Sequence, residues 1–145
     1  MEEGSKAYDV LLVEDNPGDV GLMREAFQHV KTPTSLHVAA DGVMAMEFLQ
    51  RTGQSKGAPV PALVLLDLNL PKKSGHEVLK EMKGDAILKS IPVVIVTTSH
   101  SKDDIRLCYK NQANAYVTKP GDLDDFMEVA QAIDHFWFRT ASTPN

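Results

Sequence analysis

The apolar run from Ala62 to Leu66, which leads into the carboxylate of Asp67, constrains the fold more than any other stretch of this chain. Its side chains do not alternate between apolar and polar, and Pro71 and Gly75 follow shortly after. This pattern predicts a strand buried on both faces. Such strands are typical of parallel sheets covered by helices, which bind ligands at the carboxyl ends of their strands. We therefore expect Asp67 at a ligand-binding edge, although on this segment alone it could simply cap the next turn.

Similar apolar segments alternate along the chain with segments whose apolar residues recur at helical spacing. The predicted strands span 8–13, 36–40, 62–66, 91–96 and 115–118, and the predicted helices begin near Pro17, Gly42, Ser74, Ser101 and Asp122. Five successive strand–helix units favour right-handed crossovers and parallel strands. The predicted fold class is therefore α/β, a flavodoxin-like (βα)5 fold whose doubly wound five-stranded parallel sheet has helices on both faces.

Composition limits the kind of protein further. The 145 residues are 43% hydrophobic, enough for one domain, which we place at 8–138 between a disordered N-terminus (1–7) and a C-terminal tail (139–145). The single cysteine, Cys108, excludes an internal disulfide and favours a reducing compartment, so we expect a cytoplasmic protein. No apolar run approaches the roughly 18 residues of a membrane span. A net charge of −5 offers no basic surface for nucleic acid.

Polar side chains follow all five predicted strands, but Asp41, after the strand at 36–40, should simply cap the next helix, which leaves four strand ends to consider. In chain order these four ends carry Glu14 and Asp15, Asp67, Thr97 and Lys119. Because parallel strands end at one edge of a sheet, these groups should converge. Neighbouring carboxylates raise one another's pKa values, so three of them imply a bound cation. We predict Mg²⁺, held by Asp15, Asp67 and a main-chain carbonyl near Asn69.

Lys119 and Thr97 complement this predicted metal site. A protonated lysine cannot be a metal ligand, but an ammonium and a hydroxyl can both bind the oxygens of an anion. The edge is therefore suited to a phosphoryl group held between metal, lysine and hydroxyl. Asp67 would be the attacking group and would form an acyl phosphate.

Four motifs together resemble the receiver domain of two-component response regulators. They are Val13-Glu14-Asp15-Asn16, Leu66-Asp67-Leu68-Asn69-Leu70-Pro71 with Gly75 after it, Val96-Thr97-Thr98-Ser99, and Tyr116-Val117-Thr118-Lys119-Pro120. The resemblance covers nearly the whole chain and implies a receiver-like fold. It also implies that a sensor histidine kinase phosphorylates Asp67, that Glu14 acts on the metal mainly through water, and that the protein is a phosphoacceptor rather than an enzyme, promoting its own phosphotransfer and dephosphorylation.

The resemblance assigns further roles around the predicted site. Thr97 and Lys119 would hold the phosphoryl group, and Tyr116 would swing inward together with Thr97. Asn69 and Ser99 occupy the two positions that tune the lifetime of the acyl phosphate. The peptide bond between Lys119 and Pro120 would be cis.

A narrower resemblance points to the stand-alone response regulators that partner bacterial and cyanobacterial phytochromes. It rests on the phrase Asp67-Leu-Asn-Leu-Pro-Lys-Lys, on the polar loop at 52–61, and on the ending Phe136-Trp-Phe-Arg-Thr. It implies a sensor kinase of the phytochrome type as partner.

The last predicted helix carries more apolar surface than one sheet requires. Six residues form the stripe that should face the sheet, namely Leu123, Phe126, Met127, Ala130, Ile133 and Trp137. Val129, Ala132 and Phe136 widen the apolar arc to roughly 220°. We therefore predict a homodimer, with an interface formed by Leu107, Val129, Ala132, Phe136, Trp137 and Phe138. The alternative is that Phe136 and Phe138 fold back onto their own domain.

Three other functions are alternatives to a phosphorylated switch. A phosphohydrolase of the haloacid dehalogenase type needs a second acid two residues after its nucleophile, where this chain has Asn69. A flavodoxin-like cofactor binder needs a phosphate loop after its first strand, where Glu14 and Asp15 would repel phosphate. A phosphate-independent adaptor with the receiver fold remains the third alternative.

Overall fold

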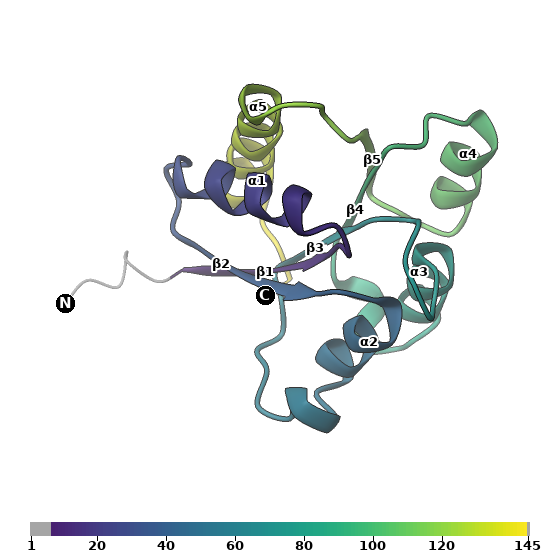
Figure 1. The fold of residues 1–145 in the computed structure, drawn as a ribbon. Helices are drawn as coiled ribbons and strands as arrows, with labels where there is room; N and C mark the ends of the chain where they lie inside the picture. Colours follow the sequence, from purple (N-terminus) through teal and green to yellow (C-terminus); the bar gives the residue numbers. More distant parts are fainter. Residues whose placement is uncertain (1–6, 145) are drawn as a thin grey trace.

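The computed structural model describes residues 7–144, and within this range five parallel strands form one sheet in the order β2-β1-β3-β4-β5 (Figure 1). The strands are β1 (Tyr8–Val13), β2 (Thr34–Ala39), β3 (Leu63–Leu66), β4 (Val93–Thr97) and β5 (Ala115–Thr118). The α-helices are α1 (Pro17–Gln28), α2 (Gly42–Gln50), α3 (Gly75–Lys83), α4 (Lys102–Lys110) and α5 (Leu123–Ile133). Two 3₁₀ turns, η2 (Gly53–Ser55) and η3 (Leu88–Ser90), and a π-helix, η4 (Asp134–Thr140), complete the regular elements of the described chain.

The predicted α/β class and doubly wound parallel sheet are confirmed, with strand boundaries displaced by only one or two residues. The predicted disorder at 1–7 concerns residues that, except for Ala7, lie outside the described range. Within residues 7–144, none of the helices has the length and apolar character needed to cross a membrane.

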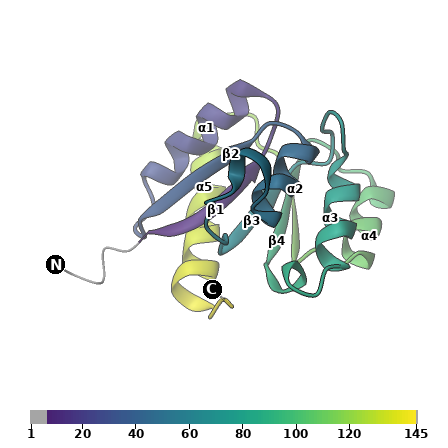
Figure 2. The same ribbon diagram turned by 90° about the horizontal axis from the view of Figure 1, so that it is seen from below.

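The helices cover the sheet in two layers, with α1 and α5 on one face and α2, α3 and α4 on the other (Figures 1 and 2). Each face has its own hydrophobic core. The central strand β3 supplies both, because Val64 and Leu66 point into one core while Leu63 and Leu65 point into the other. All four side chains are fully buried, which explains why the sequence of this strand does not alternate.

Each α-helix begins at a side chain that accepts a hydrogen bond from its first turn. The five caps are Asn16, Asp41, Ser74, Ser101 and Asp122. Such caps satisfy backbone N–H groups that have no partner within the helix. They therefore fix where α1, α3 and α4 start, immediately beyond the carboxyl ends of the strands.

Strand register brings the predicted acidic residues together. Val13 of β1 is paired with Leu66 of β3, and the backbone N–H of Asp67 donates to the carbonyl of Val13 at 3.1 Å. The loop after Asp67 is held by Gly75, where a Cβ atom would lie 2.0 Å from the carbonyl oxygen of Asp67. Only glycine permits this close approach of α3 to the strand end.

The end of the last helix differs from the prediction of a single α-helix to Phe138. The α-helix stops at Ile133, and a π-helix continues to Thr140. A π-helical turn holds more residues than an α-helical one, so the side-chain directions rotate beyond Ile133. Phe138 consequently turns inward, is only 7% exposed and stacks on Tyr8 with ring centroids 4.4 Å apart. Its predicted place on an exposed dimer surface is therefore wrong.

Candidate functional site

Three carboxylates meet where β1 and β3 end. Oxygen atoms of Glu14, Asp15 and Asp67 all lie within 4.8 Å of one another. Glu14 and Asp67 are buried, whereas Asp15 is exposed at the mouth of the cluster. The cluster combines hard oxygen ligands with an open side, which is the donor set that Mg²⁺ prefers in proteins.

Lys119, just beyond β5, bridges the buried carboxylates. Its Nζ lies 2.8 Å from Glu14 Oε1, 3.0 Å from Asp67 Oδ2 and 2.9 Å from Asp19 Oδ2. The first two partners belong to the predicted site. Asp19, in the first turn of α1, was not predicted at the site, because nothing in its local sequence indicated this contact.

Burial and hydrogen bonding shift the pKa values of Lys119 and Glu14 in opposite directions. Burial alone would lower the pKa of Lys119, but the bonds to Glu14, Asp19 and Asp67 outweigh it and raise that pKa above its ordinary value. Burial raises the pKa of Glu14, opposed by hydrogen bonds from Lys119 and from the backbone of Asn16. Lys119 therefore stays protonated, and its charge stabilises an acidic site that burial would otherwise destabilise.

The two carboxylate oxygens of Asp67 have different partners. Oδ1 accepts from the backbone N–H of Leu68 at 2.7 Å and, at 3.5 Å, from that of Asn69. Oδ2 accepts from the ammonium of Lys119. The carboxylate is thus held in one orientation at the strand end, as a nucleophile or metal ligand should be. The carbonyl of Asn69 as a metal ligand stays a prediction.

The residues of the predicted switch lie at the end of the neighbouring strand β4 and on β5, and both contact Ser99. Thr97 is fully buried at the end of β4, and its hydroxyl accepts from the backbone N–H of Ser99 at 3.5 Å. The hydroxyl of Tyr116 donates to the carbonyl of Ser99 at 2.8 Å, and its ring packs against the core under α2, α3 and α4. Tyr116 therefore lies inward in this structure.

A family model for the response regulator receiver domain matches residues 10–131. The chain belongs to this family. The response regulator Rcp1 of Synechocystis sp. is 43% identical over 143 residues, which cover 99% of this chain and 97% of Rcp1. The predicted resemblance to receiver domains is therefore confirmed.

Two solved structures match this receiver domain over almost its full length. The phosphorylated cyanobacterial phytochrome response regulator RcpA has a TM-score of 0.92 and 41% identity, covering 97% of this chain and 100% of RcpA. The Mn²⁺-bound form of Rcp1 has a TM-score of 0.89 and 43% identity, covering 95% and 99% of the two chains. Together with the acidic cluster, these likenesses support the predicted divalent cation as the cofactor of this receiver.

One expectation that came with the family resemblance is wrong. The peptide bond between Lys119 and Pro120 is trans, because no peptide bond in the described residues is cis. The trans form is the intrinsically favoured state of such bonds. The backbone N–H of Lys119 donates to the carbonyl of Thr97 at 2.6 Å, and this tether directs the lysine into the receiver site without a cis bond.

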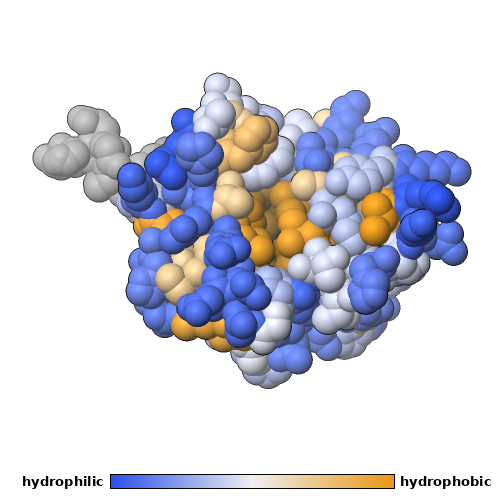
Figure 3. Space-filling model, turned by 90° about the horizontal axis from the view of Figure 1, so that it is seen from above, coloured by the Kyte–Doolittle hydropathy of each residue, from blue (hydrophilic) through white to orange (hydrophobic). Residues whose placement is uncertain are grey.

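The remaining predicted interface residues lie on the α4–β5–α5 side of the receiver. Phe136 is 51% exposed and Leu107 is 42% exposed, while Trp137 is partly buried in an edge-to-face pair with Phe136. A shallow groove of about 180 Å³ beside α5 is lined by Val94, Ala115, Val117, Val129, Ala132, Ile133 and Trp137. Figure 3 shows hydrophobic side chains gathered in a hollow on the side of the molecule where α5 and α4 lie.

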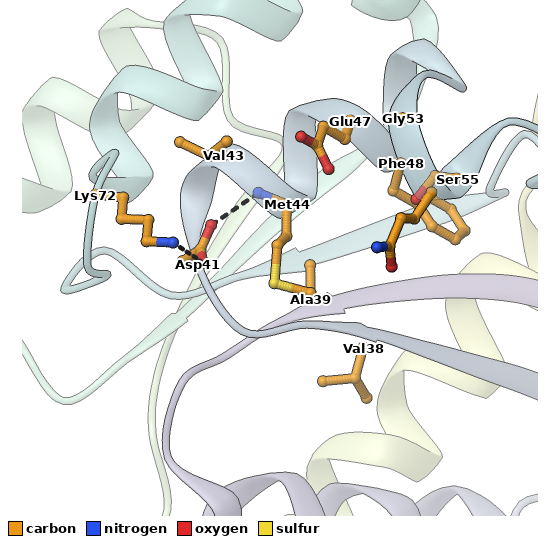
Figure 4. Close-up of a pocket in the computed structure, with 11 residues that line it drawn as sticks. Val38, Ala39, Asp41, Val43, Met44, Glu47, Phe48, Gly53, Ser55 and Lys72 are labelled. Atoms are coloured by element: carbon orange, nitrogen blue, oxygen red, sulfur yellow. Dashed lines mark hydrogen bonds and ion pairs between the residues drawn. The ribbon is translucent and has the colours of Figure 1, made fainter.

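A larger hollow beside α2 carries no comparable set of functional groups (Figure 4). Asp41, at its mouth, is already used to cap α2 through the N–H of Met44 at 2.8 Å. The same carboxylate lies 3.7 Å from the ammonium of Lys72, which joins α2 to the loop after Asp67. The charged groups of Asp41 and Lys72 at this hollow are therefore already paired within the domain.

Removing one carboxylate of the cluster tests the metal site. We expect Asp15→Asn to weaken Mg²⁺ binding by more than the roughly 10–100-fold that the loss of a merely supporting residue costs a metal site. Isothermal titration calorimetry with Mg²⁺ measures this. Asp103→Asn removes the same charge from a side chain that is 97% exposed on α4, and it should bind Mg²⁺ as the wild type does. Equal affinities for the two variants would contradict the assignment.

Proposed function

We propose that this receiver is a phosphorylation-dependent switch in which Asp67 accepts a phosphoryl group from a sensor histidine kinase. The main support for the proposal is that the ammonium of Lys119 contacts Asp67 and Glu14, two of the three acids in the cluster. A buried carboxylate with a fixed orientation, an adjacent ammonium and a cation site are the parts that phosphoryl transfer to an aspartate requires.

The proposed transfer joins a carboxylate oxygen of Asp67 to phosphorus while the bond between phosphorus and the kinase histidine breaks. The imidazole nitrogen takes up a proton as it leaves, and Asp67 becomes an acyl phosphate. Bound Mg²⁺ supplies positive charge that offsets the charge on the phosphoryl oxygens. With these groups the chain would promote its own phosphorylation and, with an attacking water, its own dephosphorylation, whose rate Asn69 and Ser99 would tune.

Lys119 and Thr97 would then hold the phosphoryl group. Lys119 lies 3.0 Å from the Asp67 oxygen that faces it, and its ammonium can turn from carboxylates to a new anion. The Thr97 hydroxyl accepts only a long bond from Ser99, so its own proton is available for donation to a phosphoryl oxygen. Movement of Thr97 would change the space beside Tyr116 and so alter the α4–β5–α5 side.

The partner we propose is a sensor kinase of the phytochrome type. The support is the near-complete match to RcpA and Rcp1, the former a phytochrome response regulator. Action in the cytoplasm is proposed with it, since a chain with one cysteine suits a reducing compartment.

We also propose a homodimer through the α4–β5–α5 side. β5 is an edge strand of the sheet, and the apolar groove beside it lies next to the exposed Phe136. A symmetric pair would cover both features on each copy with the same surface. Leu107, Val129, Ala132, Phe136 and Trp137 are the residues that would meet the second copy.

Replacing the proposed phosphoacceptor tests the function directly. Asp67→Asn should fold normally but take up no phosphate label from a kinase or from a small phosphodonor with Mg²⁺, because an amide cannot form the acyl phosphate. Asp124→Asn, an exposed acid on α5, serves as the control and should be labelled fully. Label that persists on Asp67→Asn would refute the assignment, and kinase binding without any labelling of the wild type would favour the phosphate-independent adaptor.

The dimer is tested by placing a charge on its proposed surface. Phe136→Asp should give a monomer in light scattering, because a buried unpaired carboxylate opposes association. Ile87→Asp is the matched control: Ile87 is 81% exposed but lies in the α3–β4 connection, so this variant should keep the wild-type mass. A wild-type mass for Phe136→Asp would count against the surface.

A further inference from the structure

All the polar groups of Ser99 are hydrogen-bonded. Its carbonyl accepts from Tyr116, and its N–H donates to Thr97. Its hydroxyl donates to Asp104 Oδ2 at 2.7 Å and accepts from the backbone N–H of Ser101 at 3.3 Å. Ser99, in the loop between β4 and α4, therefore connects the buried Thr97 to the inward Tyr116.

Asp104, in the first turn of α4, is held from a second direction by α3. Its Oδ1 lies 3.1 Å from Nε2 of His76, whose Nδ1 lies 3.9 Å from the Cys108 thiol. Burial raises the pKa of Cys108 to about 11, so the thiol keeps its proton and can donate to Nδ1. This arrangement leaves the Nε2–H of His76 to donate to Asp104.

The carboxylate of Asp104 is charged and has a fixed orientation. Hydrogen bonds from Ser99 and His76 lower its pKa below the ordinary aspartate value. A charged acceptor forms a stronger hydrogen bond with the Ser99 hydroxyl than a neutral one would. The chain of contacts His76–Asp104–Ser99–Tyr116 thus runs from α3 through α4 to β5.

We propose that Asp104, anchored by His76, is a positioning residue for the switch, and that it holds Ser99 so that its carbonyl keeps the Tyr116 ring inward. The inference rests on the proposed function, because it assigns a regulating contact to the same site. It also adds a second role to Ser99 beside the proposed tuning of dephosphorylation, because its hydroxyl donates to Asp104.

Loss of Asp104 should shift Tyr116 outward. Because the proposal has Asp104 hold Ser99 only while the ring is inward, loss of this hydrogen bond to a charged group should lower the ratio of inward to outward rings by about tenfold or more in Asp104→Ala. Asp104→Asn should lose less of the inward population than Asp104→Ala, since its amide oxygen can still accept a weaker hydrogen bond from Ser99.

NMR of the full chain with ¹³C-labelled tyrosine rings measures the ring position without phosphorylation. The chain has three tyrosines, and Tyr116→Phe identifies the signal of interest. Asp103→Ala, which removes the exposed neighbouring acid, is the control and should leave the signal unchanged. An unmoved Tyr116 signal in Asp104→Ala, or equal shifts in Asp104→Ala and Asp104→Asn, would overturn the proposal.

Two further measurements separate this proposal from others. Should Asp104→Ala not fold, His76→Ala must displace the Tyr116 signal in the same direction, and an unmoved signal there would overturn the proposal. Phosphate labelling of the wild type is followed in parallel. Absence of label would count against the phosphoacceptor role, whereas the ring position in unphosphorylated protein tests Asp104 alone.

Discussion

The site depends on one ammonium group, that of Lys119, set among the carboxylates of Glu14, Asp19 and Asp67. Buried carboxylates are costly unless a partner of opposite charge and hydrogen bonds compensate for the lost hydration. Lys119 supplies both to the two buried acids. Lys119 follows β5, Glu14 follows β1 and Asp67 follows β3, so the same interaction also joins the ends of three strands.

Under the proposed function, the same ammonium that stabilises the acidic site would also bind the phosphoryl group. The ammonium is a compact charge with three rotatable donors on a flexible stem. It can therefore exchange one carboxylate oxygen for a phosphoryl oxygen without moving the backbone, which is held by the bond from its N–H to Thr97. In the proposed switch, the larger rearrangement would involve Thr97, Ser99 and Tyr116, which are connected by hydrogen bonds.

The features that depend on local pattern and on strand order could be predicted from the sequence. The non-alternating run at 62–66, the caps Asp41 and Ser74, and the polar residues at the strand ends predicted the sheet, the helix starts and the acidic cluster. Parallel register then guarantees that side chains at strand ends meet, so no distance information was needed.

Other features depend on long-range packing that a local pattern does not contain. Asp19 joins the site through its contact with Lys119, and Phe138 stacks on Tyr8; each contact joins residues that lie far apart in the sequence. A pattern with α-helical period cannot anticipate the π-helix, which rotates the side chains after Ile133. The contact between His76 and Asp104 spans two helices and had no signal in residue spacing.

A double-mutant cycle on Lys119 and Asp67 tests the central interaction most directly. Lys119→Met, Asp67→Asn and the double variant are compared with the wild type by chemical denaturation in metal-free buffer. If the ammonium compensates the buried carboxylate, the free energies of unfolding should show a coupling of about 0.5–3 kcal/mol between the two substitutions. Effects that add to within about 0.3–0.5 kcal/mol, as independent sites do, would contradict the account.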